Sequence, residues 1–454
     1  MAEFGRSKVS KLDLDDPLYF DMCLSAWETR GWTFQEEHSS FRLLYFGRNM
    51  MHLACPAWNS SENGLLLSTG SVHHGPFHQL LDLAVTSKID SDQQSDEAAD
   101  DVPLWETPAF TVRQIWEHIS LITQREFTYR QDIFPAIASL AKAAAKVQND
   151  KYLAGLWEKT LHSGLLWCIC QPKPGSLDTT IAKFRRDDNG HYIAPSWSWV
   201  GSEEYFEYLA RPTYTVEEPD RSSEPADSSP FYRVGSRPSH LTSAITLLEP
   251  RIEHESASRY GRLKPGASLL IRGRLLRQFP GGGDIIQKPE GDGRPATAYF
   301  ADCLGSICLD WSVLRETRQR APERMVLLLT ASCCQATSNE VLRWHANPDE
   351  EEHTLGLSDR AVHPDRADDD DGLSPNGGDS AGSSRREEAE TCLSCLDEEG
   401  GQSKNAFGMV LYPDDKCEEG GRLRYFRVGI FVLFGYSGGL RLFEDASFYD
   451  VEIV

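Results

Sequence analysis

Trp32 and Glu36 are the residues whose types and spacing point most directly to chemistry. The segment Arg30-Gly-Trp-Thr-Phe-Gln-Glu36 predicts a short helix that begins near Trp32, and residues four apart share one face of a helix. A single carboxylate can stabilise an oxocarbenium-like transition state. The alternative is a structural role, in which Glu36 caps the helix or forms a hydrogen bond or an ion pair beside Arg30. A carboxylate catalyses little without a substrate pocket, which favours the structural role.

Histidine and cysteine groups are the other candidates for chemistry. His73, His74 and His78 lie close together, and Cys392 and Cys395 have CxxC spacing. The histidines occupy a turn-rich stretch without a Cys or Asp partner at motif spacing, so a polar surface loop is the preferred interpretation. The CxxC pair has no second pair and lies in a polar, acidic segment. We therefore predict neither a metal site nor a bound cofactor.

Composition limits the class of partner and the compartment. The chain has 454 residues and a formal net charge of −23, which repels nucleic-acid phosphates and predicts no nucleic-acid partner. Its 11 cysteines are scattered, and no secretory leader opens the sequence. The longest apolar runs are far too short for a membrane span. We expect a reduced, cytoplasmic protein without a membrane span.

The elements that must position these candidates are organised around a tryptophan-rich region between residues 152 and 201. In its last part Trp197 and Trp199 alternate with Ser196 and Ser198, and period two predicts a strand that begins at Pro195. That strand would place both indoles on one face and both hydroxyls on the other. Large aromatic side chains are usually buried, so we expect a structural motif in the core. Its members are Trp157, Trp167, Pro195, Trp197 and Trp199.

These tryptophan-rich stretches also carry a resemblance. In order, they read Tyr152-Leu-Ala-Gly-Leu-Trp157, Leu165-Leu-Trp167 and Ala194-Pro-Ser-Trp-Ser-Trp199. They resemble the region that follows the HET domain in fungal heterokaryon-incompatibility proteins. The Arg30–Glu36 segment and the strand expected over Leu43–Phe46 resemble the last block of the HET domain itself, with Glu37 where the family usually has arginine. Downstream, the strand expected over Ser268–Leu276 resembles a strand of the family, and an Arg-Val-Gly-x-Phe segment resembles one of its closing strands.

The resemblance implies a function and two alternatives. It implies a binding or regulatory module in fungal non-self recognition, incompatibility-type cell death or innate immunity. Its partners would be other HET or signalling proteins, or further copies of itself. HET domains are considered relatives of the TIR fold, and some TIR domains hydrolyse NAD with a glutamate four residues after a tryptophan. The first alternative is therefore an NAD-cleaving enzyme that uses Glu36 and Trp32, with NAD as substrate only. The second is a non-functional truncated paralogue, because two earlier HET blocks are not present in the sequence.

The predicted fold class is α+β. A small remnant of a TIR-like α/β HET domain comes first, and a helical section then leads into a mostly antiparallel β domain. Helical spacing predicts a helix over residues 133–144 with Pro135 in its first turn, and a short helix over residues 153–161. The expected divisions are 1–55 (HET remnant), 56–103 (linker or acidic loop), 104–345 (α+β domain), 346–405 (disordered acidic insert) and 406–454 (closing strands).

Overall fold

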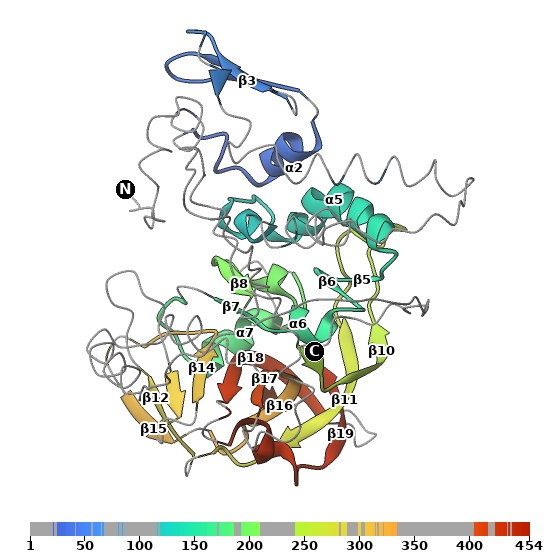
Figure 1. Ribbon diagram of the computed structural model, residues 1–454, viewed down its shortest axis with the longest axis vertical. Helices are drawn as coiled ribbons and strands as arrows, with labels where there is room; N and C mark the ends of the chain where they lie inside the picture. Colours follow the sequence, from blue (N-terminus) through green and yellow to red (C-terminus); the bar gives the residue numbers. More distant parts are fainter. Residues whose placement is uncertain are drawn as a thin grey trace, which may run out of the picture.

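A computed structural model gives the chain a mixed α+β fold, drawn in Figure 1. It describes most of residues 25–67, 119–208, 241–333 and 404–454, together with residues 21, 80, 84 and 116. Nearly all of the expected acidic insert and most of the expected linker lie outside these described residues. Of the helices that the structure describes, none combines the length and the apolar character that crossing a bilayer requires.

In the described N-terminal residues, a helix is followed by a small sheet. Helix α2 (Gly31–Ser39) begins where the sequence predicts a helix, and β1 (Leu43–Phe46) has the predicted bounds. Strands β2 (Met51–Cys55), β3 (Trp58–Ser61) and β4 (Leu66–Leu67) complete an antiparallel sheet in the order β1-β2-β3-β4. Because β2 pairs with β3, the expected domain boundary at residue 55 falls inside a sheet.

Helix α5 (Ile133–Gln148) forms the layer beneath this part in Figure 1. Pro135 lies in its first turn, as predicted, where the missing N–H breaks no helical hydrogen bond. Asn149 ends the helix in the left-handed conformation, with φ 46° and ψ 48°. Helix α2 packs on this helix, and the hydroxyl oxygens of Ser39 and Ser139 lie 3.1 Å apart. The buried apolar face of α5 consists of Ile133, Phe134, Ala136, Ile137, Leu140, Ala141, Ala143 and Ala144.

Short elements connect the helical layer to the large sheet. The described 3₁₀ helices among them are η4 (Ile119–Gln124), η5 (Arg130–Asp132) and η6 (Trp199–Gly201), and a further one, η9 (Gly439–Phe443), lies later in the chain between two strands of the large sheet. The remaining elements are β5 (Tyr152–Leu153), β6 (Leu156–Trp157), α6 (Leu161–Gly164), β7 (Trp167–Ile169), α7 (Leu177–Arg185) and β8 (Phe206–Tyr208).

The large sheet contains the remaining described strands and is mostly antiparallel. In chain order they are β9 (Thr242–Ser243), β10 (Thr246–Arg251), β11 (Ser268–Leu276), β12 (Asp284–Gln287), β13 (Ala298–Phe300), β14 (Gly305–Leu309), β15 (Thr317–Arg320), β16 (Val326–Cys333), β17 (Asn405–Pro413), β18 (Leu423–Leu433) and β19 (Phe448–Ile453).

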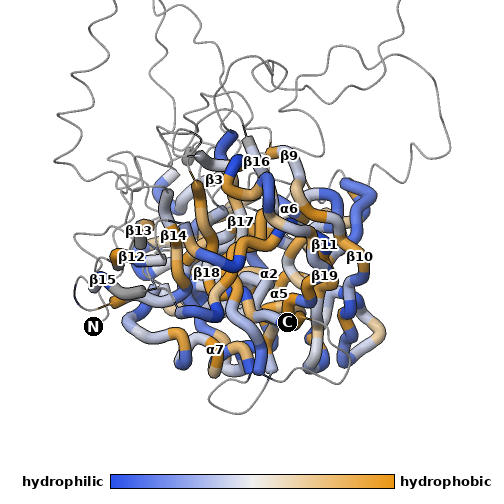
Figure 2. Tube along the Cα trace, turned by 90° about the horizontal axis from the view of Figure 1, so that it is seen from below, coloured by the Kyte–Doolittle hydropathy of each residue, from blue (hydrophilic) through white to orange (hydrophobic). Residues whose placement is uncertain are grey.

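The order of pairing closes part of this sheet on itself. The strands pair in the order β10-β11-β16-β17-β18-β14-β13-β12-β15, and β19 pairs with both β11 and β18. Strands β11, β16, β17, β18 and β19 therefore form a closed ring. Figure 2 shows apolar residues concentrated in these central strands, and both faces of β18 are buried for most of its length. Burial on both faces explains its nearly continuous apolar sequence.

The helix predicted over residues 153–161 is wrong. Residues 152–157 form the hairpin β5–β6, in which Tyr152 pairs with Trp157 and Leu153 with Leu156. Its two-residue turn is Ala154-Gly155, with φ 44° and 99°. Two positive φ values are the signature of a primed hairpin turn, which the apolar spacing alone could not distinguish from a helix.

The strand predicted over Pro195–Val200 is also wrong. Ser196 and Trp197 form a turn, and η6 begins at Trp199. The indoles and the hydroxyls therefore do not divide between two faces, since Ser196, Trp197, Ser198 and Trp199 are all buried. The segment forms no strand ladder with the described strands, and its backbone and hydroxyl groups bond to other parts of the chain, as described below.

Candidate functional site

Trp32 and Glu36 lie on the exposed side of α2. Trp32 is 43% exposed, and Glu36 is exposed and makes no hydrogen bond or ion pair with another residue that the structure describes. The opposite side of the helix is buried and includes Phe34 and Glu37. The two candidates thus share a face, as predicted, but that face is in contact with solvent and not with a described polar group. The predicted pairing of Glu36 beside Arg30 is not observed.

Glu37 is the buried carboxylate of this helix. Arg125 Nη2 lies 2.7 Å from Glu37 Oε2 and 2.7 Å from Glu28 Oε1, and its Nη1 donates to Thr33 Oγ1 at 3.0 Å. The Arg125 guanidinium carbon also lies 5.1 Å from the centroid of the Phe34 ring. A charge this deeply buried requires a partner, and the guanidinium pairs with one oxygen of each carboxylate. The ion pairs of Arg125 with Glu28 and Glu37 therefore hold α2 against the segment that precedes α5.

Tyr45 lies beside this charged group. Burial, together with the negative charges of Glu37 and Glu28, holds the pKa of its phenol well above the ordinary value. Its hydroxyl is buried and has no hydrogen-bond partner among the described residues. Trp27 packs against the Tyr45 ring edge to face, with centroids 5.6 Å apart. A neutral phenol of this kind packs the sheet against residue 27 and does not act as a base near neutral pH.

A second polar cluster joins Asp21 to the small sheet. His52 Nδ1 lies 2.8 Å from Ser61 Oγ, and His52 Nε2 lies 3.0 Å from Asp21 Oδ2. A serine, a histidine and an aspartate in series can in principle activate a hydroxyl for acyl transfer. Here the imidazole is fully buried and the serine is 5% exposed, so the hydroxyl is not presented to a substrate. The arrangement instead fixes residue 21 to β2 and β3.

Hydrogen bonds also set the ionisation of Asp21. Burial opposes its charge, but hydrogen bonds from His52 and Asn49 outweigh that effect and hold the pKa of the carboxyl below its ordinary value of 3.8. The Asn49 side chain donates to Asp21 Oδ1 at 2.8 Å. The ionised carboxylate therefore binds the β1–β2 turn as well as the imidazole.

Acid should remove the stabilisation that ionised Asp21 contributes. Because its folded-state pKa lies below 3.8, this contribution is complete above the unfolded pKa and is lost as the pH falls through the folded pKa. The melting temperatures of the wild type and Asp21→Asn should differ most near pH 6 and converge towards pH 3. The exposed variant Asp445→Asn is the control and should show no such convergence. A constant difference between wild type and Asp21→Asn across this pH range would contradict the assignment.

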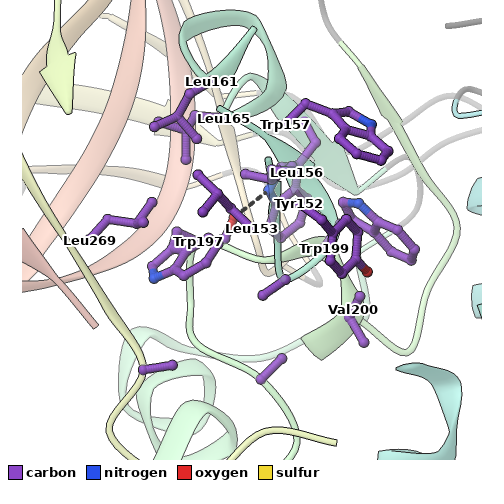
Figure 3. Close-up of a cluster of buried hydrophobic side chains, with 14 of the residues drawn as sticks. Tyr152, Leu153, Leu156, Trp157, Leu161, Leu165, Trp197, Trp199, Val200 and Leu269 are labelled. Atoms are coloured by element: carbon purple, nitrogen blue, oxygen red, sulfur yellow. Dashed lines mark hydrogen bonds between the residues drawn. The ribbon is translucent and has the colours of Figure 1, made fainter. Parts of the chain in front are cut away.

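The tryptophan motif forms one connected core, part of which Figure 3 shows. Trp157, Trp167, Pro195, Trp197 and Trp199 are all buried, as predicted. Figure 3 places Trp197 and Trp199 beside the β5–β6 hairpin. Burial of this many indoles makes the core a large contributor to the stability of the fold.

Hydrogen bonds join the separate parts of this motif. Trp199 Nε1 donates to the carbonyl oxygen of Gly155 at 2.8 Å, and Ser198 Oγ donates to that of Ala154 at 2.6 Å. Trp167 Nε1 donates to the carbonyl oxygen of Trp197 at 3.0 Å. The turn at residues 196–198 is thus held by both of the preceding tryptophan-rich stretches. These bonds explain why the segment departs from the strand that its alternation predicts.

A buried ion pair extends the motif into the large sheet. Arg427 Nη1 lies 2.8 Å from Asp310 Oδ2, and its guanidinium carbon lies 3.5 Å from the centroid of the Trp167 ring. Its Nη2 donates to the backbone oxygen of Trp167, and its backbone N–H donates to Ser196 Oγ at 2.9 Å. Burial raises the pKa of Asp310 to about 6 against the opposing charge of Arg427. Arg427 is the arginine of the Arg-Val-Gly-x-Phe segment, and nothing in the local sequence indicates its partners.

The structure does not describe the remaining histidine and cysteine candidates. His73, His74, His78, Cys392 and Cys395 lie outside the described residues. Within the described ranges, no group of three or more His, Cys, Asp and Glu side chains is placed to hold a metal ion.

Comparison with other proteins adds no further assignment. No family model matches the chain, and searches of curated proteins and of solved structures find no match either.

Proposed function

We propose that the chain is a HET-family binding or regulatory module that acts in fungal non-self recognition, incompatibility-type cell death or innate immunity. It would work in the cytoplasm, through contacts with other HET or signalling proteins. The N-terminal helix and sheet would be what remains of a TIR-like HET domain. The segments that resemble the family support the proposal, because Trp167 contacts both Trp197 and Arg427, which are far from it in sequence.

The exposed position of Glu36 is the observation that best supports a non-catalytic role for the chain. Electrostatic stabilisation of a transition state is effective in a site that excludes water and holds its groups in place. Glu36 and Trp32 face solvent, and no described polar side chain lies within hydrogen-bond reach of the Glu36 carboxylate. The carboxylate that is buried on the same helix, Glu37, is already engaged by Arg125. Neither glutamate is arranged to act on a dinucleotide by itself.

The purified chain should therefore not cleave NAD. Hydrolysis would convert NAD and water into nicotinamide and ADP-ribose, and chromatography of the released nicotinamide measures it directly. We expect no release above the buffer blank from the wild type, from Glu36→Gln or from Glu37→Gln. An authentic NAD-cleaving enzyme in a parallel reaction shows that the assay works.

Three further results would distinguish this proposal from its alternatives. Nicotinamide release by the wild type that disappears in Glu36→Gln would establish the NAD-cleaving enzyme. Release only after addition of a full-length HET protein would show that the chain completes or regulates another protein's site. In-frame stop codons upstream of the gene, together with the absence of a transcript, would favour the non-functional paralogue.

A further inference from the structure

The small N-terminal sheet has an open apolar face. Leu44 and Phe46 of β1 are 55% and 76% exposed, and Met51 of β2 is 40% exposed. Phe46 and Met51 are directly paired across the two strands, so the three side chains lie on the same side of the sheet. The other side carries the buried residues Tyr45, His52 and Ala54. We call Leu44, Phe46 and Met51 the β1 face.

Strand β1 is also an edge of this sheet. Among the described strands it pairs with β2 alone, in the register that joins Leu43 to Ala54 and Phe46 to Met51. The backbone groups on its other side are therefore open to hydrogen bonding in the described part of the chain. An open edge beside exposed apolar side chains is the arrangement that accepts an additional strand.

Two arginines flank this edge. Arg42 directly precedes β1 and Arg48 follows it by two residues, and both are exposed. Neither forms an ion pair with another described residue. They form a basic border in a chain whose formal net charge is −23. Exposed charges of one sign around an apolar surface select a partner of the opposite sign.

The same charges argue against pairing between two copies. In an antiparallel pair of β1 strands, Arg42 of one copy would lie near Arg48 of the other, and like charges opposite each other are destabilising. Each copy would also bring a formal charge of −23. A partner segment with acidic side chains avoids the contact between like charges, because its carboxylates would face Arg42 and Arg48.

We propose that β1 binds an extended, acidic and apolar segment of a partner protein, which adds to the sheet as a strand. Its backbone would pair with Leu43–Phe46, its apolar side chains would cover the β1 face, and its carboxylates would meet Arg42 and Arg48. This inference rests on the proposed binding function and specifies the chemistry of the partner.

The probe is a fluorescein-labelled Val-Glu-Val-Glu-Val-Glu peptide, titrated with the full chain and followed by fluorescence polarisation. The comparison peptide has lysine in place of each glutamate. We expect the glutamate peptide to bind at least about tenfold more tightly, and its affinity to fall with added salt. Hydrogen exchange measured with the bound peptide should slow at residues 43–46, where strand addition would protect the amides.

Variants of the exposed residues locate the site without disturbing the core. Phe46→Ser should weaken binding of the glutamate peptide by about tenfold or more, since it removes a large apolar contact. The double variant Arg42→Glu, Arg48→Glu should abolish the preference for glutamate over lysine. Leu248→Ser and Arg315→Glu are matched controls at exposed positions elsewhere, and both should bind like the wild type. Unchanged melting temperatures would show that all four variants fold.

Several outcomes would overturn the inference. They are the absence of peptide binding, equal affinity for both peptides, protection that lies away from residues 43–46, and sedimentation as a dimer that Phe46→Ser dissociates. Each of these can occur in a chain that does not cleave NAD, so the inference can fail while the binding function itself stands. Nicotinamide release that depends on Glu36 would instead remove the proposed function.

Discussion

Replacing Asp310 with asparagine should lower the free energy of unfolding by about 3–5 kcal/mol, because it leaves a fully buried guanidinium without its counter-charge. Arg427 is 0% exposed, and its Nη1 lies 2.8 Å from Asp310 Oδ2. Urea unfolding at pH 8 measures the change with the wild-type carboxyl in its charged form, since burial raises its pKa to about 6. This loss is a large share of the stability of an ordinary domain.

Two further variants test the cause. Replacing both partners, with Asp310→Leu and Arg427→Met together, should restore most of the loss, because no buried charge is then left unpaired. Asp450→Asn is the matched control, since it removes the carboxylate of an exposed pair with Arg272. That change should leave the unfolding midpoint close to the wild-type value. If Asp310→Asn unfolded like the control, the assignment of a buried, stabilising ion pair would be incorrect.

Replacing Trp197 or Trp199 with alanine should each cost about 3–5 kcal/mol through loss of packing and formation of a cavity. Both indoles are 0% exposed, and the Trp199 ring stacks on Phe206 with centroids 4.8 Å apart. Thermal and urea unfolding of the purified variants provide the measurement. Trp32→Ala is the control with the same change of side chain on the exposed side of α2, and it should alter stability by no more than about 0.5 kcal/mol.

Phenylalanine variants separate packing from hydrogen bonding at the same positions. The Trp199 N–H donates to the carbonyl oxygen of Gly155, whereas the buried Trp197 N–H has no hydrogen-bond partner among the described residues. Trp199→Phe should therefore lose a hydrogen bond in addition to some packing, and Trp197→Phe should lose packing alone. A wild-type melting temperature in either alanine variant would contradict the placement of these indoles in the core.

Predictions from the local sequence pattern are confirmed for segments whose conformation depends mainly on their own residues. The bounds of Leu43–Phe46 and Ser268–Leu276 agree with the observed β1 and β11, and α5 contains Pro135 in its first turn as expected. In these segments hydrophobic periodicity, segment length and, in α5, the position of the proline all favour the same structure. The coarse fold class, mixed α+β with mostly antiparallel sheets, is confirmed for the same reason.

The two wrong elements are those whose conformation depends on distant partners. Tyr152–Trp157 is a hairpin because its turn at Ala154-Gly155 is bonded to Ser198 and Trp199, more than 40 residues away. Residues 195–200 form a turn and a 3₁₀ helix that pair with no described strand, and Ser198 and Trp199 bond instead to the Ala154-Gly155 turn. The spacing of apolar residues within a short segment carries no information about such distant hydrogen bonds. It therefore cannot distinguish a helix from a strand or a turn.

The same distinction between local and distant determinants applies to the residues of the candidate site. The sequence by itself determined that Trp32 and Glu36 share a helix face, and that the tryptophans are core residues. Only the tertiary structure decided which face of that helix meets solvent, because Glu37 is buried through a bond to Arg125, 88 residues away. It likewise brought Arg427 to Asp310 and Trp167, since the cost of burying a charge is offset only by partners that the fold supplies from other strands.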